Sequence, residues 1–139
     1  MPTPPQYLSG LDVIAMNDEI VRRSGADGGL LRDEGALESA LMRPQMAAHY
    51  EQADFVTQVA VLMVGVALAH PFLDGNKRTA LAVGTTFCFL NGYAIVSEPT
   101  GLGRQIEAVV TREDRVEDAT ARFIAWLRQH MQATPVSND

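Results

Sequence analysis

The sequence has one cysteine, Cys88, and one lysine, Lys77, against ten arginines. A single cysteine excludes an internal disulfide, and because Cys88 lies in an apolar run we expect a buried, unreactive thiol. Positive charge is scarce as well. The net charge of -6 argues against a general nucleic-acid-binding protein, which would usually present a basic face. A local basic pocket is still compatible with this total.

No apolar run is long enough to span a membrane. The longest uncharged run, 55–69, contains Thr57 and Gln58 and is too short. Residues 1–5 have neither the basic start nor the apolar centre of a signal peptide. We therefore expect no membrane contact and a cytoplasmic location. The glycine-rich stretch 25–29 does not follow a predicted strand and has no GxGxxG pattern, so we do not interpret it as a phosphate loop.

The 139 residues suffice for one domain with a core, but not for two. Apolar residues recur at helical spacing through most of the chain. We expect a single all-α domain, a compact bundle of about six helices, with flexible ends at 1–6 and 132–139. The first expected helix has its cap at Ser9 and ends near Ser24. The next three are expected at 33–42, 55–69 and 76–90, and the last two include 102–110 and 116–127. Pro44 should end the second helix, and 93–96 could be extended.

Helices 55–69 and 76–90 are the most apolar, and a polar turn joins them: His70-Pro71-Phe72-Leu73-Asp74-Gly75-Asn76-Lys77-Arg78-Thr79-Ala80. Histidine changes charge near neutral pH, so His70 is a candidate general base. The carboxylate of Asp74 is a hard oxygen ligand that suits Mg²⁺. The unpaired N–H groups at the start of a helix form an anion site. These features predict phosphoryl or nucleotidyl transfer, with phosphates bound by Gly75, Asn76, Lys77 and Arg78.

Simpler interpretations of these residues remain open. Asp74 could only cap the following helix, Asn76 could only shape the turn, and Phe72 is expected to anchor the turn in the core. Lys77 is the most informative residue, because cations at a helix N-terminus are unfavourable unless an anion is bound. Since the chain uses arginine everywhere else, a compact ammonium indicates phosphate binding here.

The turn also resembles a known family. It matches the Fic/Doc signature HxFx(D/E)(G/A)N(G/K)R from His70 to Arg78, and the continuation Lys77-Arg78-Thr79-Ala80 resembles the Doc (death-on-curing) branch. Segments 31–41, 43–45 and 89–93 are similar to Doc-type segments as well. The resemblance implies a Fic/Doc-like helical domain over 1–139, with a short flap at 44–53 that holds the target chain beside the active site.

The Doc resemblance further implies a toxin of a toxin–antitoxin pair. Such an enzyme uses ATP and Mg²⁺ to phosphorylate a protein hydroxyl, and the implied target is elongation factor Tu. Many Fic proteins carry an inhibitory helix with the pattern (S/T)xxxE(G/N). Here Glu34-Gly35 is the only Glu-Gly pair and Leu30 occupies the Ser/Thr position, so the pattern fails. We therefore expect an antitoxin protein to supply inhibition.

Two alternatives remain. AMP-transferring Fic proteins resemble one another in GNGRxxR, but this chain has Lys77 and Leu81 at the second glycine and second arginine positions. These two substitutions favour transfer of the γ-phosphate over transfer of AMP. The other alternative is an inactive binding module with the same fold, which is disfavoured because every key position of the signature is intact.

Overall fold

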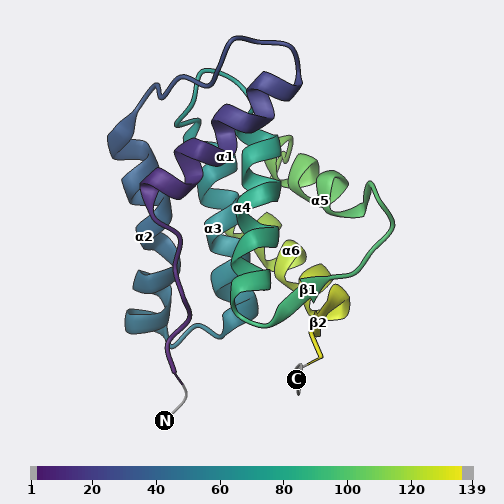
Figure 1. The fold of residues 1–139 in the computed structure, drawn as a ribbon. Coiled ribbons are helices and arrows are strands. Elements are labelled where there is room, and N and C mark those ends of the chain that lie inside the picture. Colours follow the sequence, from purple (N-terminus) through teal and green to yellow (C-terminus); the bar gives the residue numbers. More distant parts are fainter. Residues whose placement is uncertain (1–2, 136–139) are drawn as a thin grey trace.

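The computed structural model describes residues 3–135, and it confirms the predicted helical bundle. Within that range the helices are α1 Gly10–Arg23, α2 Glu34–Glu51, α3 Phe55–Ala69, α4 Asn76–Leu90, α5 Gly101–Val110 and α6 Val116–His130. Two short strands, β1 Tyr93–Ile95 and β2 Met131–Ala133, pair in antiparallel register. Figure 1 shows α3 and α4 at the centre of the bundle.

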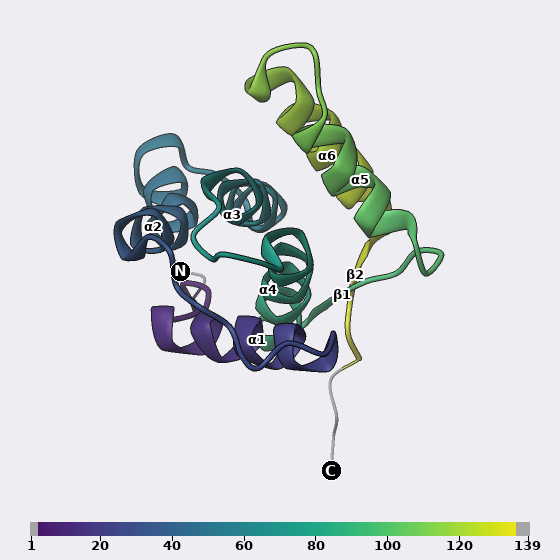
Figure 2. The same ribbon diagram turned by 90° about the horizontal axis from the view of Figure 1, so that it is seen from above.

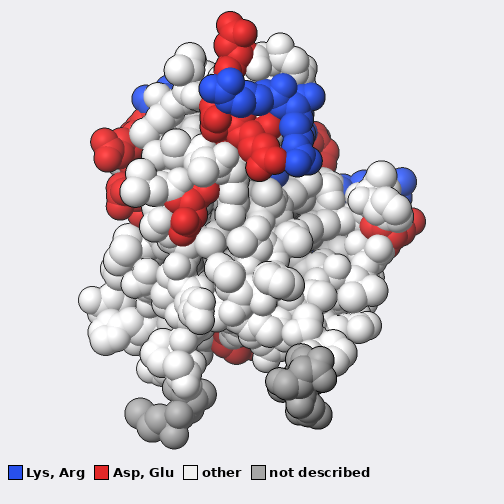
Figure 3. Space-filling view, viewed as in Figure 1, with Lys and Arg blue, Asp and Glu red and all other residues white. Residues whose placement is uncertain are grey.

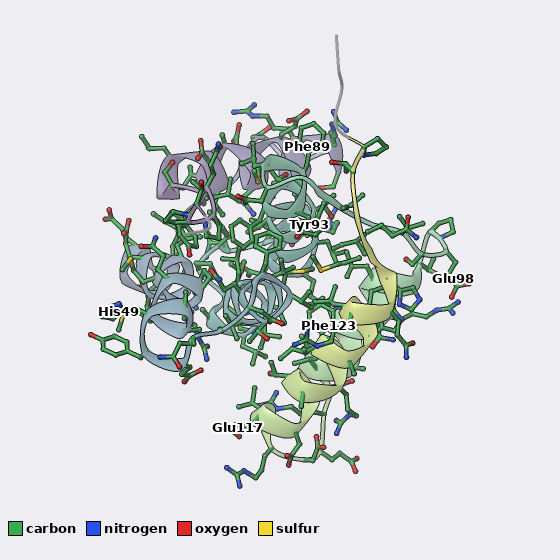
Figure 4. All side chains as sticks on the ribbon, turned by 90° about the horizontal axis from the view of Figure 1, so that it is seen from below. His49, Phe89, Tyr93, Glu98, Glu117 and Phe123 are labelled. Carbon is green, nitrogen blue, oxygen red and sulfur yellow. The ribbon has the colours of Figure 1, made fainter. Side chains whose placement is uncertain are left out.

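Helix α3 is buried along most of its length, as its uniformly apolar sequence predicts. Helices α1 and α2 cover one side of the α3–α4 pair, while α5 and α6 lie together on the other side (Figure 2). Phe123 points from α6 toward α3 and is buried (Figure 4). Cys88 lies in the same core, which confirms the expected buried thiol, and burial raises the pKa of that thiol to about 12.

The cap of the first helix explains why it begins where the sequence predicts. The Ser9 hydroxyl accepts a hydrogen bond from the Asp12 N–H (3.2 Å), and the Asp12 carboxylate accepts one from the Ser9 N–H (3.0 Å). This reciprocal pair satisfies two N–H groups that the helix itself leaves without partners. Helices α3 and α4 also begin and end at the predicted residues.

The prediction that Pro44 ends the second helix is wrong. Helix α2 continues through Pro44 to Glu51, so the flap expected at 44–53 is mostly helix. The missing N–H of Pro44 removes one helical hydrogen bond. The buried side of the helix nevertheless continues past it, and packing of that side stabilises the longer helix. The buried residues of α2 are Leu37, Ala40, Leu41, Pro44 and Ala47.

A different segment lies in extended conformation beside the polar turn. Leu31 forms an antiparallel bridge with Phe72. The N–H groups of Arg32 and Asp33 donate to the Pro71 carbonyl (2.8 and 3.0 Å). Segment 30–33, rather than 44–53, is therefore the extended piece next to the predicted site.

Parts of both chain ends take part in a strand or in hydrogen bonds. Strand β2 includes residues 132 and 133, which we expected to be flexible. Gln6 exchanges two hydrogen bonds with the side chain of Asn91 (2.7 and 3.0 Å). Flexibility of the ends stays a prediction, and residues 1–2 and 136–139 lie outside the described residues. Within 3–135, no helix is long and apolar enough to cross a membrane.

Candidate active site

The polar turn joins the two central helices, and two left-handed residues shape it. Helix α3 ends at His70 (φ 48°, ψ 55°), and α4 begins after Gly75 (φ 76°, ψ 18°). A left-handed backbone suits glycine but is uncommon for histidine. Phe72 is 2% exposed and anchors the turn in the core, as predicted. The turn is therefore anchored in the core between the two central helices.

The side chain of Asn76 closes this turn. Its Nδ2 donates to the Phe72 carbonyl (2.8 Å), and its Oδ1 accepts from the Phe72 N–H (3.0 Å). The first helical bond of α4 runs from the Thr79 N–H to the Gly75 carbonyl (2.8 Å). The N–H groups before Thr79 thus have no acceptor within the helix and suit an anion. The side chain of Asn76 shapes the turn, while its main-chain N–H can donate a hydrogen bond to a phosphate.

Asp74 precedes the helix without capping it. Its carboxylate accepts one hydrogen bond, from the Gly75 N–H (2.7 Å), and α4 has no side-chain cap. The side chain is exposed, so its other oxygen is accessible to a ligand. Residues 3–135 contain no group of three His, Cys, Asp or Glu that could enclose a metal. One accessible carboxylate fits Mg²⁺, because this ion keeps several waters and binds mainly through substrate phosphates.

The two cations of the turn differ in their surroundings. Lys77 forms an ion pair with Glu107 of α5, and both side chains are about half exposed. Arg78 is exposed, and within residues 3–135 it forms no ion pair. Charged side chains gather at the end of the molecule where this turn lies (Figures 1 and 3).

An open pocket of about 320 Å³ lies over the turn. The structure brings all six predicted site residues together around it, with Leu73 completing the wall. The lining residues are His70, Leu73, Asp74, Gly75, Asn76, Lys77 and Arg78. An imidazole, a carboxylate, a helix N-terminus and two cations thus surround one pocket, and phosphoryl transfer can use groups of these kinds.

Residues 7–88, more than half of the chain, match the family model described as the Fic/DOC family. The chain belongs to the Fic/Doc family. It is 36% identical over 97 residues to "Toxin Doc" of Mycolicibacterium smegmatis (strain ATCC 700084 / mc(2)155), which covers 67% of this chain and 70% of the relative. It is 33% identical over 95 residues to "Protein kinase doc" of Escherichia phage P1, which covers 68% of this chain and 75% of the relative.

Sequence reasoning missed the residues that hold the Fic/Doc turn from outside it. Arg32 donates to the His70 carbonyl from Nε (2.8 Å) and from Nη2 (2.5 Å), which fixes the end of α3. Asn17 donates to the Asp74 carbonyl (2.8 Å). Glu107 lies beyond the residues that the family model matches. A sequence pattern offers no signal for these contacts, because they join distant parts of the chain.

Proposed function

We propose that this chain is a Doc-type toxin that transfers the γ-phosphate of ATP to a hydroxyl group of a protein. The observation that carries the proposal is the placement of Lys77 and Leu81 on α4. Lys77 lies in the first turn beside the pocket. Leu81, one turn later, is half-buried against the core and cannot clamp a phosphate as the second arginine of AMP transferases would.

Each pocket residue has a separate role in the proposed reaction. His70 takes the proton of the target hydroxyl, whose oxygen forms a bond to the γ-phosphorus. The bond between that phosphorus and the β–γ bridging oxygen breaks, and ADP leaves. The N–H groups at the start of α4, together with Lys77 and Arg78, bind the phosphate oxygens. Asp74 would hold Mg²⁺, which neutralises phosphate charge when bound.

We assign the target-holding role expected of the flap to the extended segment 30–33. The Leu30 carbonyl accepts a hydrogen bond from the Leu73 N–H (3.0 Å), so the segment lies directly beside the pocket wall. Leu30 and Leu73 are both exposed apolar side chains. Such side chains suit an extended protein segment laid alongside the pocket. We propose a translation elongation factor, such as elongation factor Tu, as the protein that supplies the hydroxyl.

Inhibition is proposed to come from a separate antitoxin protein. Leu30 lies in the extended segment, while Glu34 begins α2. These two residues therefore do not share a helix, as the inhibitory pattern of Fic proteins would require. The name of the Mycolicibacterium smegmatis relative, "Toxin Doc", supports a toxin. Since residues 3–135 do not place this pattern on one helix, a separate partner is needed to cover the pocket.

Expression in a bacterial host tests this proposal. We expect induced wild-type protein to stop incorporation of labelled methionine into protein and to arrest growth. The His70→Ala variant, produced at the same level, should neither stop protein synthesis nor arrest growth. Normal protein synthesis in cells that accumulate folded wild-type protein, with no antitoxin present, would contradict the proposal.

A further inference from the structure

Asn17 is a buried polar residue on the otherwise apolar side of α1. Its side chain is 1% exposed, and its helical neighbours Val13 and Val21 belong to the buried core. The Nδ2 atom donates to the Asp74 carbonyl (2.8 Å) and to the Thr79 hydroxyl (3.1 Å). One amide group thus contacts the start of α4 on both sides of the Gly75 cap.

The oxygen of the same amide has no hydrogen-bond partner among the described residues. It lies against Gly29, where an added Cβ would come within 2.3 Å of it. A buried oxygen without a partner is unfavourable, and an apolar side chain of the same size would avoid it. Stability of the core therefore gives no reason for asparagine at position 17. The two bonds from Nδ2 are what an apolar side chain could not provide.

We propose that Asn17 is a positioning residue of the active site. It acts through the main chain of Asp74 and fixes the turn that carries the carboxylate and the first N–H groups of α4. The contact is close on the glycine side too, since a Cβ added at Gly75 would lie 3.3 Å from the Asn17 Nδ2. The role in transfer rests on the proposed function, while the effect on the turn does not.

Positioning of this kind has a large effect on rate. A displacement of about 1 Å in a reacting group can reduce the rate about 100-fold, even when the altered residue lies away from the chemistry. In the proposed reaction, the Asp74 carboxylate and the N–H groups of α4 act on the phosphates of one ATP molecule. If the Asp74 carbonyl were released from α1, the turn could rotate and the two groups would lose their relative placement.

The double variant Asn17→Leu/Thr79→Val separates positioning from stability. It replaces both side-chain partners by apolar groups of similar size, a change that is often nearly neutral for folding. Only the Asp74 carbonyl loses its side-chain donor, in a contact that is partly buried. We expect a melting temperature close to that of the wild type, amide exchange at the hydrogen-bonded N–H groups of Leu73 and Gly75 about 10-fold faster, and toxicity and transfer rate reduced about 10- to 100-fold.

Asn91→Ala is the matched control. Asn91 also donates from Nδ2 to two carbonyls, those of Gln6 (3.0 Å) and Phe87 (2.8 Å), but at the opposite end of α4. It should leave the exchange of the Leu73 and Gly75 N–H groups and the toxicity unchanged. The proposal is overturned if the folded double variant keeps wild-type exchange or wild-type toxicity, or if the control loses activity equally. If wild-type protein transfers no γ-phosphate, the proposed function fails, while exchange and toxicity still test Asn17.

Discussion

Lys77, which lines the candidate pocket from α4, forms an ion pair with Glu107 of α5. The only lysine of the chain, which the sequence assigns to phosphate, thus has a carboxylate beside it. Both side chains are about half exposed. Exposed pairs of this kind contribute only about 0–1 kcal/mol, so a nucleotide phosphate can displace Glu107 from Lys77.

Glu107 is therefore expected to compete with the nucleotide. Glu107→Gln removes the competing charge, and we predict that MgATP binds several-fold more tightly, as measured by titration calorimetry. Glu113→Gln removes an exposed carboxylate that, within residues 3–135, forms no ion pair with a pocket residue, and it should leave the affinity unchanged. Unchanged or weaker binding by Glu107→Gln would show that Glu107 does not restrain Lys77.

His70→Ala is predicted to abolish toxicity while the protein still folds. Removing a positioned general base reduces a rate by about 10²- to 10⁴-fold. The side chain is exposed, so its loss should change the melting temperature little. His49→Ala is the matched control, because His49 lies on α2 outside the pocket (Figure 4). Full toxicity of His70→Ala would remove this residue from the mechanism.

Asp74→Asn tests the assignment of the magnesium ligand. The amide oxygen can still accept the hydrogen bond from the Gly75 N–H, so the shape of the turn should persist. The negative charge is lost, and we expect the reaction to need about tenfold more Mg²⁺ for half-maximal rate. The measurement is a magnesium titration of the transfer rate. An unchanged titration would mean that Asp74 serves only the geometry of the turn.

The pair of Asp54 and Arg128 predicts how stability depends on pH. A hydrogen bond from Arg128 (2.7 Å) and others from Thr57 lower the pKa of Asp54 to about 2. Since the unfolded pKa is about 3.9, this stabilisation is present above pH 4 and is lost as the pH falls toward 2. It is modest, because the side chain is about half exposed and salt weakens the pair.

Thermal unfolding of the wild type and Asp54→Asn checks that prediction. Asparagine can still cap α3, so the variant should lose mainly the charge-dependent part. The difference in melting temperature between the two proteins should be largest near neutral pH and shrink between pH 4 and pH 2. It should also shrink at high salt. A difference that stays constant over this pH range would contradict the interpretation.

Local sequence signals predicted much of the fold. The Ser9 cap and the limits of α3 and α4 could be predicted because neighbouring residues determine them. Helix α2 was predicted too short because Pro44 normally stops a helix, whereas packing of its buried side overrides that preference. Strand β2 was missed because its pairing with β1 depends on a segment far away in the chain.

The candidate site likewise has residues that the sequence predicted and residues that it did not. The pocket residues were predicted because they are contiguous between His70 and Arg78. Asn17 and Glu107 were not, because they lie 57 and 30 residues from their partners in the turn. No periodicity or motif reports such contacts.

The position of the transferred label tests the proposed phosphotransfer most directly. The purified protein would be incubated with Mg²⁺, elongation factor Tu or a bacterial extract, and ATP labelled at either the γ- or the α-phosphate. His70→Ala serves as the control for background labelling. We predict that the target protein acquires the γ label and not the α label. Transfer of the α label would contradict phosphotransfer and show that the enzyme transfers AMP.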